Sequence, residues 1–212
     1  MIRYLLFETR IAVPWGVFLL PVLFAILRLT KAVSPEVPGM WAGWISFLEF
    51  IFPIIFPLFA FTLLEQEKRW RALEVMVATP KRKAAIFLVR YLILLFPLFL
   101  AVAAAVRPRE YLLLMAPGLA LGGAALLGGL ILGEETGLGL ALGWWGFSFA
   151  IWVARTELFK TGVASWALLI ITPSPLSPSE VLLRKWAHLG AGLVFLFLAM
   201  LVAERKRAWK PR

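Results

Sequence analysis

A single carboxylate, Glu49, lies inside the long apolar run from Trp41 to Leu64. A carboxylate in lipid is costly and usually faces a cavity or a partner, so Glu49 is a candidate to bind substrate or a proton. It also lies about two helical turns from the outer end of the run, where its side chain could reach the membrane interface. Pro53 and Pro57 in the same run remove backbone N–H groups, and the exposed carbonyls make them possible pathway residues, although simple bends are the plainer interpretation.

A serine and a histidine in apolar surroundings form the second candidate pair. Ser148 stands in Gly146-Phe-Ser148-Phe-Ala150, and His188 is the only histidine of the chain. Nucleophilic catalysis would require the two side chains to be in hydrogen-bond contact beside an oxyanion hole. The flanking residues are not the Gly-x-Ser-Gly of rhomboid-type intramembrane proteases, and a lone histidine at the end of a span is more often a polar cap.

The composition indicates a helical membrane protein. Hydrophobic residues make up 62% of the 212 residues, and the mean hydropathy is +0.88. Apolar runs of about 20 residues match a bilayer core of about 30 Å and do not alternate as the strands of a membrane barrel do. The chain has no cysteine, which excludes disulfides and thiolate metal sites. It also has no Asn, and this absence of thermolabile residues is a hint of a thermophilic source.

The apolar runs predict an all-α membrane protein with a single domain over residues 1–212. It has six spans, a cytoplasmic helix after the second and a re-entrant segment, Trp166 to Pro173, before the sixth. Residues Gly133 to Gly137 are expected to form a tight turn, and residues 155–185 a long outer connection. Glycines four apart, such as Gly118 and Gly122, allow close helix packing. The expected spans are residues 11–27, 41–64, 84–106, 111–132, 138–154 and 186–203.

The distribution of Lys and Arg predicts the orientation. The side that holds both termini carries 14 of these residues and the opposite side carries 8, Arg184 and Lys185 among them. Both termini are therefore expected in the cytoplasm, with the chain in the inner (plasma) membrane. The net charge of +10 is accounted for by anionic membrane lipid, so no nucleic-acid partner is expected.

The segment after the second span combines charge with a short apolar patch. Glu67 and Arg71 have helical pairing distance, and Thr79-Pro80 ends the helix before the basic run that opens the third span. An apolar patch on a charged cytoplasmic helix is typical of a helix that docks into a groove of another protein. The expected coupling surface consists of Glu65, Glu67, Arg69, Arg71, Leu73, Glu74, Met76, Thr79, Pro80 and Arg82.

In this segment the chain resembles the ABC-2 type permeases, the membrane subunits of a group of ABC exporters. Leu73-Glu74, Thr79-Pro80, Arg82 and Arg90 match the family pattern, whereas Arg71-Ala72 stands where Gly-Thr is usual and Arg90 where Lys is usual. The span count, the re-entrant stretch and the basic C-terminal end also match. The departure at Arg71 bears on the fine geometry of the docking segment.

The resemblance implies a membrane subunit that moves substrate out of the cytoplasm as a dimer. The chain has no phosphate-binding loop and no cofactor of its own, so ATP and Mg²⁺ would be bound by a separate ATPase subunit, and the chain is not expected to be an enzyme. The second partner would be another permease chain, identical or homologous. The alternatives left open are a haem-exporter permease of cytochrome c maturation, an intramembrane serine protease and a non-transporting membrane scaffold.

Overall fold

The computed structural model describes residues 19–29, 38–69, 83–154, 168–169 and 177–205, and all secondary structure in these ranges is helical. The prediction of an all-α chain is confirmed for these residues. Each of the described α-helices overlaps one of the six expected spans. The elements are α2 (Leu19–Leu29), α3 (Pro38–Arg69), α5 (Lys83–Ala105), the 3-10 helix η2 (Pro108–Glu110), α6 (Tyr111–Leu132), α7 (Glu134–Ala154) and α8 (Pro178–Arg205).

Four of the described helices are long and apolar enough to cross a membrane, by length and composition. They indicate a membrane protein. The helix α7 has 21 residues but is not among these four, and α2 is described over only 11 residues. The four segments are Gly39–Gln66, Phe87–Ala105, Tyr111–Leu132 and Pro178–Arg205.

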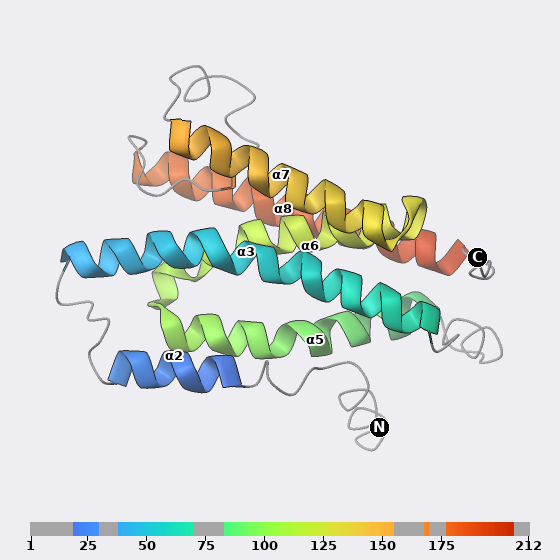
Figure 1. Cartoon of the computed structure of the whole chain (residues 1–212), viewed down its shortest axis with the longest axis horizontal. Helices are drawn as coiled ribbons and strands as arrows, with labels where there is room; N and C mark the ends of the chain where they lie inside the picture. The colour runs from blue at the N-terminus through green and yellow to red at the C-terminus, as the bar shows by residue number, and fades with distance from the viewer. Residues whose placement is uncertain (1–18, 30–37, 70–82, 155–167, 170–176, 206–212) are drawn as a thin grey trace.

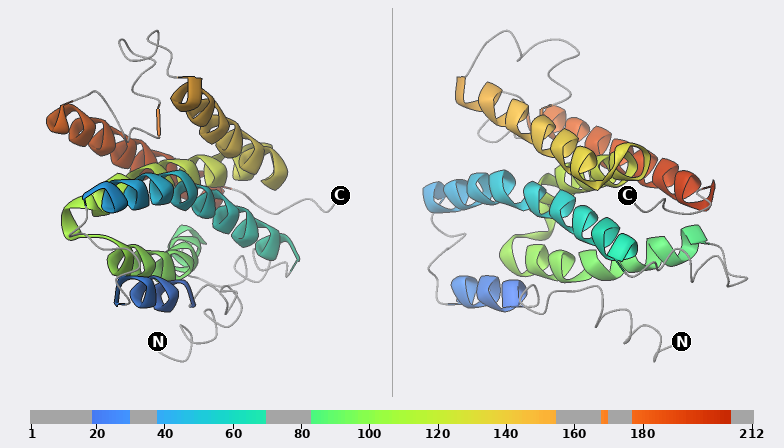
Figure 2. Two further views of the ribbon diagram at one scale, coloured as in Figure 1. Left: turned by 60° about the vertical axis from the view of Figure 1, so that its left-hand side comes forward. Right: turned by 45° about the vertical axis from the view of Figure 1, so that its right-hand side comes forward.

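The helices run back and forth between two ends of the molecule (Figures 1 and 2). The C-terminal ends of α3 and α8, the N-terminal end of α5 and the junction of α6 with α7 lie at one end of the bundle, on the right in Figure 1. The opposite end holds the start of α3, the η2 turn and the start of α8. This alternation is the one expected of consecutive membrane crossings.

The helix α6 forms the centre of the bundle and packs against α3, α7 and α8. Its glycines permit this close packing, as predicted. A Cβ atom on Gly123 would lie 2.8 Å from the carbonyl oxygen of Gly192 in α8, and one on Gly122 would lie 3.1 Å from Cβ of Phe56 in α3. Side chains at these positions would push α8 and α3 away from α6.

Two expected boundaries are wrong. The turn predicted over residues 133–137 is a single residue, Gly133, whose φ of 112° suits glycine, and α7 begins directly at Glu134. The outer connection predicted to reach Lys185 is shorter, because α8 begins at Pro178. The last residues of the expected connection, 178–185, therefore form the first two turns of α8.

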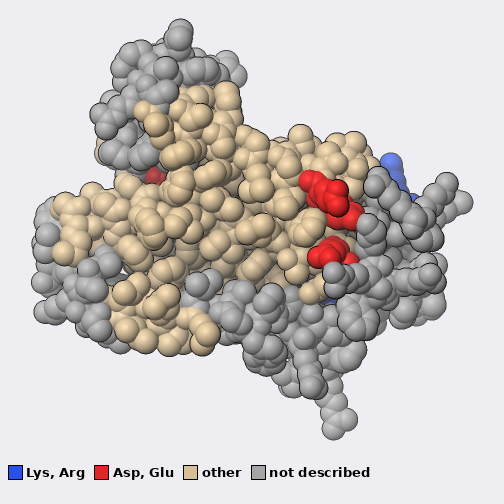
Figure 3. Space-filling view, in the orientation of Figure 1, with Lys and Arg blue, Asp and Glu red and all other residues tan. Residues whose placement is uncertain are grey.

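The surface of the bundle is largely apolar. In Figure 3 the middle of the visible face has no charged side chain among the described residues, and the charges lie at the ends, chiefly at the right-hand end. Large apolar side chains on α8 point outward, and a lipid environment explains their exposure. They include Leu193, Val194, Phe197 and Leu201.

Candidate functional site

The carboxylate of Glu49 is fully buried and pairs with the ammonium group of Lys185. Glu49 comes from α3 and Lys185 from the second turn of α8, so the contact joins residues 136 positions apart. The interpretation of Glu49 as a side chain that reaches the membrane interface is therefore wrong. Lys185, which the sequence placed among the charges of the outer connection, is as buried as its partner.

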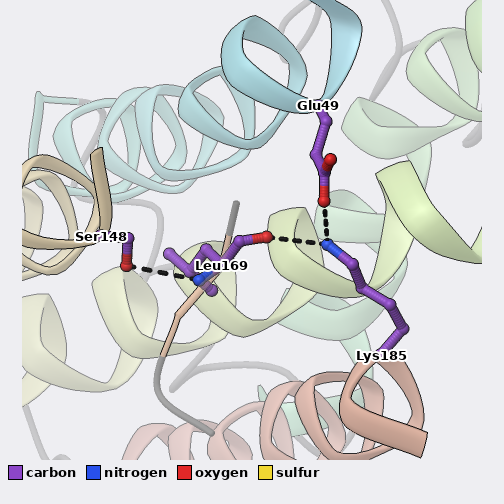
Figure 4. A network of polar contacts seen from close by, with 4 residues as sticks. All are labelled: Glu49, Ser148, Leu169 and Lys185. Carbon is purple, nitrogen blue, oxygen red and sulfur yellow. Dashed lines mark hydrogen bonds and ion pairs between the residues drawn. The ribbon is translucent and has the colours of Figure 1, made fainter. Parts of the chain in front are cut away.

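The pair continues into a short polar network (Figure 4). The Nζ atom of Lys185 also donates to the carbonyl oxygen of Leu169, at 2.7 Å. The N–H of Leu169 donates to Oγ of Ser148 at 3.3 Å, and that hydroxyl donates to the carbonyl oxygen of Trp144 at 3.0 Å. Side chains from α7 and α8 thus hold both polar groups of one buried, non-helical residue.

The electrostatics of the site follow from its burial. Both charged side chains have no exposed surface, so each loses its hydration and depends on its partner. Their charges sum to zero, and two of the three ammonium hydrogens of Lys185 have acceptors, on Glu49 and Leu169. Replacing either charge alone would leave an uncompensated ion in an apolar interior.

The helix α3 is weakened beside the ion pair. Pro53 lies four residues after Glu49 and has no N–H to donate to the Glu49 carbonyl group. At Phe50, the residue after Glu49, the backbone carbonyl oxygen accepts a hydrogen bond from the indole N–H of Trp145 in α7, at 3.1 Å. The rings of Phe50 and Trp145 also contact, with centroids 4.9 Å apart. Pro53 and Pro57 are both buried in the bundle, and the structure does not assign them to a pathway.

A capping motif that the sequence analysis missed explains why Lys185 is helical and buried. The Ser177 backbone N–H donates to Oε2 of Glu180 at 2.9 Å, and the Glu180 N–H donates to Oγ of Ser177 at 3.3 Å. This is a capping box with a proline at the first helical position. The sequence Ser177-Pro-Ser-Glu180 matches the pattern of this motif, in which Ser or Thr is followed three residues later by Glu or Gln. From that start, Lys185, His188 and Gly192 recur at helical spacing on the buried face.

The geometry of Ser148 is that of a structural hydroxyl group. Its single proton is directed at the Trp144 carbonyl oxygen four residues back in the same helix, and its oxygen accepts from Leu169. A serine nucleophile instead directs its proton at a base. His188 is 3% exposed, so its interpretation as a polar cap at the interface is wrong.

A second buried carboxylate, Glu110, organises the same end of the bundle. Its Oε1 accepts from the indole N–H of Trp41 at 2.8 Å, and its Oε2 accepts from the backbone N–H of Arg107 at 3.0 Å. The guanidinium carbon of Arg107 lies 5.4 Å from the centroid of the Trp41 ring. These contacts of Glu110 and Arg107 with Trp41 attach η2 to the start of α3, and a structural role accounts for them.

The expected coupling surface is described only at its beginning. Glu65 is half-buried near the end of α3, and Glu67 and Arg69 belong to the last turns of this helix. The remaining residues lie outside the described ranges, so their expected helix stays a prediction. These are Arg71, Leu73, Glu74, Met76, Thr79, Pro80 and Arg82.

Comparisons with family models, with curated proteins and with solved structures found no match to this chain. Among the described residues, no group of three or more His, Cys, Asp or Glu side chains is arranged to hold a metal ion. The buried ion pair and its network are therefore the site that the structure itself singles out.

Proposed function

We propose that the chain is the membrane subunit of an ATP-driven ABC exporter, which works with a separate ATPase subunit and a second permease chain. The observation that carries this proposal is the length of α3. Its 32 residues extend about 48 Å, whereas a bilayer core is about 30 Å thick. The helix therefore continues beyond the apolar region into the charged residues Glu65–Arg69 instead of ending at the lipid surface.

The position of this extension supports docking of a partner. It lies at the end of the bundle where α5 begins and α6 meets α7. The residues between α3 and α5 are those that resemble the coupling segment of ABC-2 permeases. A partner bound to this segment would transmit its movement to α3, because the charged turns and the apolar turns belong to one continuous helix.

Replacing Leu73 and Glu74 with alanine tests the proposal. Loss of a central apolar anchor costs about 2 kcal/mol or more, and an interfacial charge left unpaired costs about 2–5 kcal/mol. The double variant should lose the co-purifying ABC-type ATPase and its transport activity while the membrane bundle stays folded. The matched control is Leu201→Ala with Glu204→Ala, two exposed residues of α8 at the same end. Retention of the ATPase and of transport in the first variant would refute the docking role.

The stoichiometry is a separate test, because six helices would provide half of a pathway. Extraction in mild detergent should give two permease chains with two ATPase chains. The exposed face of α7 offers a contact for the second chain, since Gly139 and Gly143 have open space where a Cβ atom would stand. Transport by a stable single permease chain would contradict the dimer.

The orientation is tested with reporter fusions. Fusions at Lys83, Gly137 and Arg212 should report the cytoplasm, and fusions at Arg107 and Ser174 the outside. A cytoplasmic reporter at Ser174 would overturn the six-span arrangement.

A further inference from the structure

The ion pair joins two helices that otherwise do not pack along each other. Both α3 and α8 pack along α6, and Glu49 and Lys185 meet across the space between them. A contact of this kind can break without separating an extended helix interface, because α6 continues to hold each helix. The pair is therefore placed where a small movement of α3 or α8 would open it.

The same ammonium group holds Leu169 in the interior. The Leu169 side chain has no exposed surface, and its backbone groups bond to Ser148 and Lys185 rather than to a helix or strand. Non-helical backbone in a membrane interior persists only while such partners satisfy it. Once Lys185 leaves, the Leu169 carbonyl group must find another donor, and water is the nearest general source.

A hinge lies beside the contact. Pro53 cannot donate to the Glu49 carbonyl group, so α3 lacks one helical hydrogen bond at the residue that forms the ion pair. The part of α3 before Glu49 can tilt at this point at lower cost than elsewhere in the helix. Hinge, ion pair and buried backbone coincide within one region.

From this arrangement we propose that the Glu49–Lys185 pair is a latch with an open state. In the closed state Lys185 holds Glu49 and Leu169 inside the bundle. In the open state the pair separates, α3 tilts at Pro53, and Leu168 and Leu169 become accessible to water. This proposal makes no use of an ATPase and stands or falls independently of the exporter assignment.

The absence of native cysteine allows a direct test by thiol labelling. Leu168, half-buried next to Leu169, is replaced by cysteine in protein reconstituted into nanodiscs, where both faces are open to a polar maleimide. In the otherwise native chain this cysteine should react slowly. With Glu49→Gln plus Lys185→Met the rate should rise about tenfold or more, which corresponds to about 1.4 kcal/mol in favour of the open state.

Three controls keep the outcome interpretable. The double replacement removes both charges together, so the bundle should remain folded while the donor to Leu169 is lost. A cysteine at Leu98, buried in α5, should stay unreactive in both backgrounds, and one at the exposed Ser179 should react equally fast in both. Unchanged labelling at Leu168 with these controls in place would overturn the latch, as would labelling at Leu98 that rises in parallel with it.

Discussion

The energetics of the buried ion pair can be measured with a double-mutant cycle. Glu49→Gln leaves the Lys185 ammonium group without its counter-charge, and Lys185→Met leaves the Glu49 carboxylate without its cation; both side chains are fully buried. Breaking a buried pair from one side costs about 3–5 kcal/mol. Lys185→Met also removes the donor to Leu169, which costs about 1–3 kcal/mol more.

The double variant should be more stable than either single variant. It has no buried charge, and its remaining costs are the Leu169 carbonyl group and the buried amide introduced by Glu49→Gln, which has lost its Lys185 partner, about 1–3 kcal/mol each. The coupling energy between the two positions should therefore reach at least about 3 kcal/mol. Unfolding of the purified protein by a denaturing detergent in mixed micelles, followed by the fluorescence of the 10 tryptophans, gives these free energies.

Additive effects would refute this reasoning, as would a Glu49→Gln variant that loses less than about 1 kcal/mol. The same variants separate stability from transport. If Glu49 lines a pathway, transport should stay low in the double variant although its stability has recovered. If Glu49 acts only through its pairing, transport should recover with stability.

Three further predictions concern packing and capping. Gly192→Leu should destabilise the bundle by about 1–3 kcal/mol or more, because its side chain would meet the α6 backbone, whereas Gly190→Leu, with open space around it, should be tolerated in the same detergent titration. Ser177→Ala should cost about 0.5–2 kcal/mol by removing the cap of α8, seen as a lower midpoint of thermal unfolding. Tyr91→Phe should leave the midpoint unchanged or raise it, since the buried hydroxyl has no hydrogen-bond partner among the described residues; a fall would show that the hydroxyl is satisfied.

The helix positions were predictable because each apolar run has the length of a membrane crossing. The run from Tyr111 to Leu132 coincides with α6 at both ends, since charged or glycine residues flank it sharply. The helix α8 begins eight residues before its predicted start at Trp186. The apolar run used for the prediction is bounded by the charged residues Arg184 and Lys185, whereas the helix itself starts at the capping box of Ser177.

The candidate site was only half predictable. A carboxylate inside an apolar run marks Glu49 from its sequence neighbours alone, but its partner is 136 residues away and lies next to another basic residue. A lysine at a span end counts as an orientation signal until the helical register shows which face it occupies. Leu169 carries no signal at all, because its role rests on backbone groups that every residue has.

The one-residue junction at Gly133 has a consequence for how the protein is made. No slack exists between α6 and α7, so neither helix can settle in the membrane at a depth independent of the other. During synthesis the two should enter the bilayer together as a hairpin, and α7, which is not among the four helices long and apolar enough to cross a membrane, would be carried in with α6. The central helix of the bundle would then be in place before α8 leaves the ribosome, ready to receive it along Gly123.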